Sequence, residues 1–152
     1  MYITDYLKQY KNEKIKLYID MDGVIADYDV LNASNYDKKR PLKTNIKVLE
    51  DLSNNNNIEM YILSISRYNE GLEEKNTWLD ENVKFIPKSN RIIISREANN
   101  FIKSKNLKSN FFKKLDRDKS IIILIDDDPR VLEQVNKDNP DVLLLKDTAL
   151  IL

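Results

Sequence analysis

The sequence contains no cysteine and no histidine. Without cysteine there is no disulfide bond, no thiolate nucleophile and no zinc-thiolate site, a composition that fits a reducing compartment. Without histidine, the commonest general base and the commonest metal ligand are missing. Any enzyme chemistry must therefore rest on carboxylates, lysine, serine or tyrosine. Any metal should be a hard cation with oxygen ligands, such as Mg²⁺.

An excess of one charge and long apolar runs are also missing. The 25 lysine and arginine residues balance the 25 aspartate and glutamate residues, so the whole chain has no strong attraction to nucleic acid or to an anionic membrane. The longest aliphatic run, Ile121 to Ile125, is far too short to span a bilayer, and the first residues lack the hydrophobic region of a signal peptide. We expect a cytoplasmic protein with no membrane partner, in which any binding to nucleic acid requires a local basic patch.

With 152 residues the chain can bury one continuous core, and we expect a single domain over residues 1–152. Its apolar residues alternate between a period of two and helical spacing. Strands are predicted over residues 15–19, 58–63, 91–95, 120–125 and 142–145, with a short extended piece over 83–86. Helices are predicted over residues 2–12, from a Thr44 cap to Leu52, around Leu72 to Leu79, over 97–115 with a break near 106–108, and from Pro129 with Asp128 as its cap.

Strands that alternate with helices at this spacing predict a mainly parallel, Rossmann-like sheet in a doubly wound three-layer α/β/α domain. In such sheets, ligands bind beyond the carboxyl ends of the strands. Polar side chains gather at these ends, with Asp20 and Asp22 after the first strand, Ser64 after the second, and Asp126 and Asp127 after the fourth. Four clustered carboxylates repel one another unless a cation neutralises them, and Mg²⁺ prefers oxygen ligands of this kind.

In chain order, these strand ends resemble a known family. Asp-Met-Asp-Gly-Val at residues 20–24, Ile-Leu-Ser at 62–64, a lysine before a later helix, and Ile-Asp-Asp at 125–127 are similar to the four motifs of the haloacid dehalogenase-like phosphatases. The motifs span residues 15–130, nearly the whole predicted domain. The resemblance implies the fold of that family and the activity of a Mg²⁺-dependent phosphoric monoester hydrolase.

The resemblance also implies roles for the aspartates. Asp20 would be the nucleophile that attacks phosphorus and forms an aspartyl phosphate. Asp22 would protonate the leaving oxygen and then activate water, a role that requires a raised carboxyl pKa. Asp20, the backbone carbonyl of Asp22 and Asp126 would bind Mg²⁺. Asp127 would either help to bind the metal or only stabilise the loop.

Two further positions implied by the resemblance have alternatives. Ser64 would bind a phosphoryl oxygen, and Ser66 is the alternative and a candidate substrate-binding residue. A lysine would neutralise the charge that accumulates on the phosphoryl group. Lys108 is favoured because it lies just before an apolar helical segment and 18 residues ahead of Asp126. Three other lysines stay open as alternatives: Lys103, Lys105 and Lys119.

Within this family, residues 20–28 resemble the opening of the 5′(3′)-deoxyribonucleotidases, and Glu-Lys-Asn-Thr-Trp-Leu at residues 74–79 resembles a later Lys-x-x-Trp stretch in them. There, the aromatic residue at the Tyr28 position packs on the nucleobase, so Tyr28 is a candidate platform and Lys75 a candidate phosphate ligand. Gly23 would allow the tight turn after the nucleophile. The implied substrate is a small phosphorylated molecule, with a nucleoside monophosphate as the leading candidate.

Two features favour other substrates. Only 41 residues separate Asp22 from Ser64, which leaves little room for the helical cap of those nucleotidases. An open site suits the phosphate of a macromolecule or closure by a partner. Residues 101–119 contain seven Lys or Arg against two Asp, with three Phe interleaved; they form either a polynucleotide groove or a helix with Phe in the core and Lys in water. The alternatives are a capless phosphatase on nucleic-acid ends or a phosphoprotein, and a receiver-like signalling module that accepts phosphate.

Overall fold

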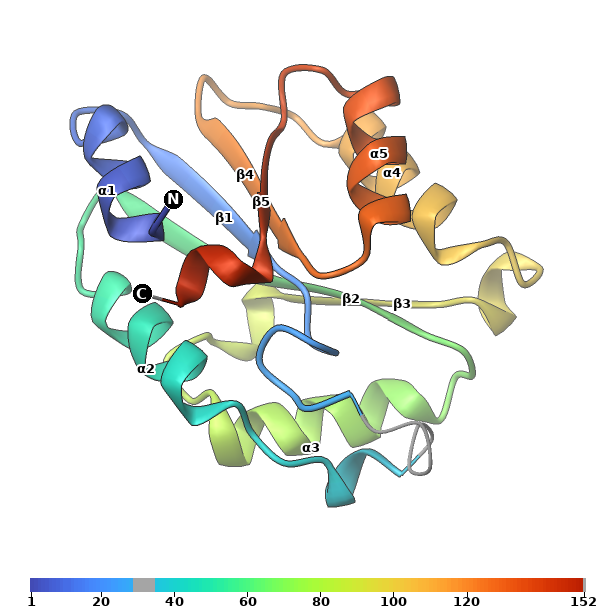
Figure 1. Cartoon of the computed structure of the whole chain (residues 1–152). Coiled ribbons are helices and arrows are strands. Elements are labelled where there is room, and N and C mark those ends of the chain that lie inside the picture. Colours follow the sequence, from blue (N-terminus) through green and yellow to red (C-terminus); the bar gives the residue numbers. More distant parts are fainter. Residues whose placement is uncertain (29–34, 152) are drawn as a thin grey trace.

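The computed structural model describes residues 1–28 and 35–151, and its central element is a sheet of five parallel strands (Figure 1). The strands are β1 (Ile15–Ile19), β2 (Ile58–Ser66), β3 (Arg91–Ser95), β4 (Ile121–Asp126) and β5 (Leu143–Lys146). Their spatial order is β3-β2-β1-β4-β5, and every neighbouring pair runs parallel. The predicted α/β class with a parallel, Rossmann-like sheet is confirmed.

Helices cover both faces of this sheet (Figure 1). They are α1 (Ile3–Leu7), α2 (Lys43–Leu52), α3 (Gly71–Asn82), α4 (Ser104–Lys114) and α5 (Pro129–Asp138). Short 3₁₀ turns lie at Lys8–Tyr10, Tyr36–Lys38, Lys88–Asn90, Glu97–Asn99 and Asp147–Leu150. The buried residues of α1, α2 and α3 join the core on one face of the sheet, and those of α4 and α5 join the core on the other. This is the predicted three-layer arrangement.

The central strand β1 is apolar on both faces because each face meets a helical layer. Leu17 and Ile19 belong to the core beneath α1, α2 and α3. Tyr18 belongs to the opposite core, where its ring stacks on Tyr61 at 4.8 Å and meets Phe112 edge-on at 5.4 Å. Packing on both sides therefore fixes the carboxyl end of β1.

The strand order brings three polar strand ends together. β1 lies between β2 and β4, and Ile19 is in register with Ile62 and Ile125. The carboxyl ends of these three strands therefore meet at one edge of the sheet. β2 runs to Ser66 rather than ending at the predicted residue 63, so Ser64 lies within its last residues, while Asp20 follows β1 and Asp126 ends β4. Receiver domains have the strand order 2-1-3-4-5, in which the first strand neighbours the third. Because β1 here neighbours β4, the topology contradicts the receiver-like alternative.

Two predictions at the edges of helices are wrong. Residues 83–86 form a turn rather than an extended piece, because Val83 and Ile86 are fully buried in the main core and the chain must bend to place both there. Helix α2 begins at Lys43, one residue before the predicted cap. Thr44 therefore lies inside the first turn of α2, which has no side-chain cap.

The predicted break in the helix near residues 106–108 is also wrong. Helix α4 runs through these positions without interruption, because Leu107 and Lys108 are buried and tertiary contacts override weak local propensity. The chain breaks earlier, at Asn100 and Phe101, whose φ angles are both +56°.

Two other local predictions are confirmed. Asp128 accepts a hydrogen bond from the backbone N–H of Arg130 at 2.9 Å, and Pro129 occupies the first turn of α5.

The carboxyl edge of the sheet is open in the part of the chain that the structure describes. Between Asp22 and α2, the described residues form only a turn and one 3₁₀ turn, so no cap covers the edge there. Among the described residues, no helix combines the length and apolar character needed to cross a membrane.

Replacing Phe112 with alanine should lower the free energy of unfolding by about 3–5 kcal/mol, the usual cost of removing a buried Phe ring. Phe112 is 0% exposed and contacts the rings of Tyr18 and Phe111. Urea denaturation followed by circular dichroism measures the loss. Lys114→Ala, an exposed position in the same helix, is the control and should change stability by less than about 0.5 kcal/mol. Equal effects of the two substitutions would contradict the packing described.

Candidate active site

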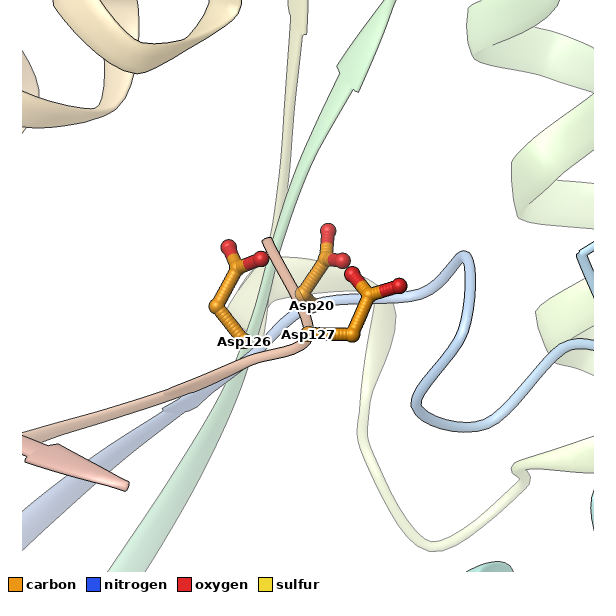
Figure 2. Close-up of side chains that lie close together, drawn as sticks. All are labelled: Asp20, Asp126 and Asp127. Atoms are coloured by element: carbon orange, nitrogen blue, oxygen red, sulfur yellow. The ribbon is translucent and has the colours of Figure 1, made fainter. Parts of the chain in front are cut away.

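Three carboxylates gather at the carboxyl edge of the sheet. Asp20 follows β1, where its backbone N–H donates to the carbonyl of Ile125 at 3.0 Å. Asp126 ends β4, and Asp127 follows it. Each offers a carboxylate oxygen, and these oxygens lie within 4.8 Å of one another (Figure 2). Asp20 is 7% exposed and Asp126 1% exposed. The structure therefore brings the predicted nucleophile together with two predicted metal ligands.

A buried lysine lies between two of these carboxylates. Lys108, in α4, donates from Nζ to Asp20 Oδ1 at 2.7 Å and to Asp126 Oδ2 at 2.6 Å. Burial lowers the pKa of Lys108, but the charges of Asp20 and Asp126 outweigh burial and raise the pKa above its usual value. Burial raises the pKa of Asp20, and the Lys108 charge opposes this rise. The alternative lysines lie elsewhere: Lys103 and Lys105 line a neighbouring cavity, and Lys119 is exposed before β4.

Asp22, in the turn after β1, contacts a second set of groups. Its Oδ1 accepts hydrogen bonds from Lys39 Nζ at 2.5 Å and from the Tyr36 hydroxyl at 3.0 Å, and Lys75 Nζ lies 3.5 Å from its Oδ2. Burial raises the pKa of Asp22, but the charges of Lys75 and Lys39 outweigh burial and hold it below its usual value. In the free protein the shift is thus opposite in direction to the raised pKa expected for an acid catalyst.

Lys75, in α3, connects Asp22 to Ser64. Its Nζ donates to Ser64 Oγ at 2.7 Å and to a β2 backbone carbonyl at 2.8 Å. Burial lowers the pKa of Lys75, and the charge of Asp22 opposes this shift. Ser64 is thus part of the network around Asp22, whereas the Ser66 hydroxyl donates to the carbonyl of Tyr68 at 2.7 Å.

Gly23 lies in the tight turn that directly follows Asp20 and Asp22. Its φ angle is +80°, and a Cβ atom at this position would lie only 2.0 Å from Asp127 Oδ2. Two features explain why this turn requires glycine: the positive φ angle and the close approach of the Asp127 carboxylate. The cavity that Gly23 lines contains Asp27 and Arg40 and differs from the cavity around Asp20.

Lys39 is a site residue that the sequence does not reveal. Its side chain is buried, pairs with Asp22, and lies 4.6 Å from the centre of the Tyr36 ring. The backbone carbonyl of Lys39 accepts a hydrogen bond from the Trp78 indole at 3.0 Å, which anchors this segment on α3. No local pattern distinguishes Lys39 from its basic neighbours in the sequence. Its position depends on the packing of its segment against α3.

Tyr28 lies at the rim of the site. It is 62% exposed and lines a cavity of about 440 Å³ together with Asp20, Asp22 and Lys108. The Lys39 ammonium group lies 6.0 Å from the centre of the Tyr28 ring. A ring in this position is accessible to a flat ligand group that enters the cavity.

The charge balance of the site suits a divalent cation and a phosphate. The groups involved are the carboxylates of Asp20, Asp22, Asp126 and Asp127 and the buried ammonium groups of Lys39, Lys75 and Lys108. With all seven groups ionised, the formal net charge of this set is one negative charge, which a divalent cation would change to one positive charge. The clustered carboxylate oxygens fit such a cation, because Mg²⁺ prefers ligands of this kind. The arrangement can therefore hold a metal ion and a phosphate dianion side by side.

No protein-family model and no curated protein matches this sequence. Solved structures do match its fold. A chain of the Pnkp1/Rnl/Hen1 RNA repair complex aligns with a TM-score of 0.67 at 18% identity, covering 89% of this chain and 42% of that chain. A second structure of the Pnkp1/Rnl/Hen1 complex gives a TM-score of 0.67 at 18% identity, with 88% and 46% covered.

A third match is the N-terminal part of the protein BF1531 from Bacteroides fragilis, which contains a phosphatase domain complexed with Mg. It aligns with a TM-score of 0.57 at 16% identity, covering 93% of this chain and 39% of that chain. The present chain thus spans less than half the length of each matched chain. It shares its fold with a part of each of them.

Replacing Lys108 with methionine should destabilise the protein by about 3–5 kcal/mol, because Asp20 and Asp126 then remain buried without their counter-charge. Chemical denaturation in the absence of divalent cations measures this loss. Lys114→Met, an exposed position in the same helix, is the matched control. If both variants lose the same amount, the two carboxylates do not depend on Lys108.

Gly23→Ala should cost about 1–2 kcal/mol of stability from its positive φ angle alone, and more from contact with the Asp127 carboxylate. Adding Asp127→Ala removes the contact, so the double variant should regain part of the loss. A double-mutant cycle measured by thermal unfolding separates the two effects. Strictly additive losses would show that the added methyl group does not meet Asp127.

Proposed function

We propose that this chain is a Mg²⁺-dependent phosphomonoesterase that works through an aspartyl-phosphate intermediate. The observation that carries the proposal is the position of Asp20, a buried carboxylate at the carboxyl edge of a parallel sheet, bound to Lys108 and beside Asp126 and Asp127. A carboxylate can act as a nucleophile on phosphorus where nearby cations neutralise the phosphate. Mg²⁺ bound by these three aspartates and the backbone carbonyl of Asp22 would stabilise the charge on the phosphoryl oxygens.

The proposed reaction has two steps. In the first, an Asp20 carboxylate oxygen attacks phosphorus, the ester P–O bond breaks, and the leaving oxygen takes a proton from Asp22. In the second, water attacks the phosphorus of the aspartyl phosphate and gives a proton to Asp22, which releases inorganic phosphate and free Asp20. Ser64 and Lys75 bind phosphoryl oxygens, and Lys108 holds the Asp20 carboxylate in place.

Substrate binding itself would prepare Asp22 for its role as an acid. In the free protein, Lys75 and Lys39 lower the pKa of Asp22. A phosphate dianion bound at Lys75 would offset part of the positive charge that Lys75 exerts on Asp22. It would also place a negative charge beside the Asp22 carboxylate. Both changes raise a carboxyl pKa.

Two substrate classes fit this site. A nucleoside monophosphate is supported by Tyr28, which is exposed at the rim of the cavity around Asp20. A phosphate at a nucleic-acid end is supported by the open edge in the described residues and by the shared fold with a chain of an RNA repair complex. An edge without a cap among the described residues favours the second class, because a large substrate can itself exclude water from the reacting groups.

Phosphate release from nucleoside monophosphates, sugar phosphates and end-phosphorylated oligonucleotides should require Mg²⁺ and should fall by about a thousandfold or more in Asp20→Asn, which lacks the nucleophile. A colorimetric phosphate assay with and without chelator measures this. Asp5→Asn, which removes an exposed carboxylate that pairs with Lys8 on α1, is the control and should retain activity. If no substrate in the panel releases phosphate in a Mg²⁺-dependent way, the proposal is wrong. The relative rates on nucleoside monophosphates and on oligonucleotides decide between the two substrate classes.

A further inference from the structure

A basic cavity adjoins the carboxylate site. It has a volume of about 350 Å³, and its lining comprises Arg96, Lys103, Ser104, Lys105, Asp128 and Arg130. Ser104, Asp128 and Arg130 also line the cavity that contains Asp20 and Lys108. A ligand with its terminal phosphate at Asp20 would therefore meet this basic cavity with its next group.

The lining of this cavity has a strong excess of positive charge. Arg130 pairs with Asp128 at 3.0 Å, so these two charges offset one another. Arg96, Lys103 and Lys105 remain as three positive charges around one small space. Ser104 and Lys105, the first two residues of α4, also line this cavity, and the helix begins there without a side-chain cap. The cavity is therefore suited to an anion, although the chain as a whole has no net charge.

The segment beside the cavity is held in an unusual backbone conformation. Arg96 donates to the carbonyls of Phe101 at 2.8 Å and Ile102 at 2.9 Å, and these bonds fold the segment around its guanidinium group. Asn100 and Phe101 both have φ of +56°, which is uncommon for residues other than glycine and unfavourable for a bulky one. The result is a Phe101 ring that is 47% exposed, whereas Phe112 is fully buried and Phe111 packs against the same core as Phe112.

An exposed aromatic pair lies next to the basic cavity. The Phe101 ring centre is 6.2 Å from that of Tyr68, which is 44% exposed, and the Arg67 guanidinium lies 5.6 Å from the Tyr68 ring centre. Arg67 and Tyr68 line a further cavity of about 640 Å³ with Arg96 and Asp22. Aromatic rings for base stacking, combined with positive charge for the backbone, are the usual features of a surface that binds single-stranded nucleic acid.

We propose that this basic–aromatic surface, formed by Arg67, Tyr68, Arg96, Phe101, Lys103 and Lys105, binds the single-stranded polynucleotide that leads to the scissile terminal phosphate. The inference rests on the proposed function and names its substrate class. Lys103 and Lys105, with Arg96, bind the internal phosphate next to the end. Tyr68 and Phe101 stack on an adjacent base. A nucleoside monophosphate has no second phosphate that could bind these basic side chains, and a phosphopeptide has no base that could stack on the two rings.

Oligonucleotide binding to Asp20→Asn tests the proposal separately from turnover. Fluorescence anisotropy with labelled single-stranded RNA and DNA of one sequence, each with a terminal phosphate, measures affinity at several salt concentrations. Adding Lys103→Ala and Lys105→Ala should weaken binding at least about tenfold and make the slope of log affinity against log salt shallower by about 0.7, the value for one phosphate that is no longer neutralised on a single strand. The two nucleic acids distinguish an RNA end from a DNA end.

Two further variants complete the test. Lys113→Ala with Lys114→Ala, at the other end of α4, should leave affinity and salt slope unchanged. Phe101→Asn removes the ring but keeps a residue that tolerates positive φ, and it should weaken binding about tenfold through lost stacking. Equal affinity and salt slope for the 103/105 and 113/114 pairs would overturn the proposal, as would tighter binding of a phosphopeptide than of an oligonucleotide.

Hydrolysis of p-nitrophenyl phosphate separates this inference from the proposed function. In the background that keeps Asp20, the Lys103 and Lys105 substitutions should lower turnover of the oligonucleotide but not of this small substrate, because the basic cavity lies outside the reacting groups. Intact hydrolysis with unchanged oligonucleotide binding in this variant would defeat only the inference. Absence of hydrolysis in the unaltered protein, together with the expected binding losses, would defeat only the phosphatase function.

Discussion

The bonds from Lys108 to Asp20 and Asp126 are the interaction on which the rest of the site depends. They join α4 to the ends of β1 and β4, and the two residues of the Lys108–Asp20 pair are 88 positions apart in the chain. Two buried carboxylates this close to one another are unfavourable without a cation between them. The same bonds fix the start of α4, where Ser104 and Lys105 line the neighbouring basic cavity. The carboxylate site and the surface beside it are thus held by one network.

The two aspartates of the first motif have opposite electrostatic surroundings although only Met21 separates them. Burial raises the pKa of Asp20, whereas the charges of Lys75 and Lys39 lower the pKa of Asp22. Environments that push two carboxyl pKa values apart are typical of sites where the two groups have different roles. Here the separation arises because burial and the charge of Asp126 outweigh Lys108 at Asp20, whereas Lys75 and Lys39 outweigh burial at Asp22.

No cap among the described residues separates the carboxylate site from the neighbouring cavities. Ser104 lines the cavity around Asp20, the basic cavity and the cavity beside Tyr68, so these spaces meet at the start of α4. The strained backbone at Phe101 keeps one ring at the surface of this region, while Phe112 in the next helix is fully buried. Strain of this kind persists only where the surrounding contacts enforce it, and here the bonds of Arg96 do so.

The sequence by itself determined the strands and the polar residues at their ends, because apolar periodicity and turn chemistry act over a few residues. Asp20, Ser64 and Asp126 could therefore be assigned to one sheet edge before any contact was known. Only the tertiary structure decided which lysines reach that edge. Lys75 and Lys108 were candidates from their sequence context, Lys108 with three alternatives, and Lys39 was not indicated at all. Each of the three is buried because separate segments pack around it. Burial of a long charged side chain is a property of that packing, so no local rule predicts it.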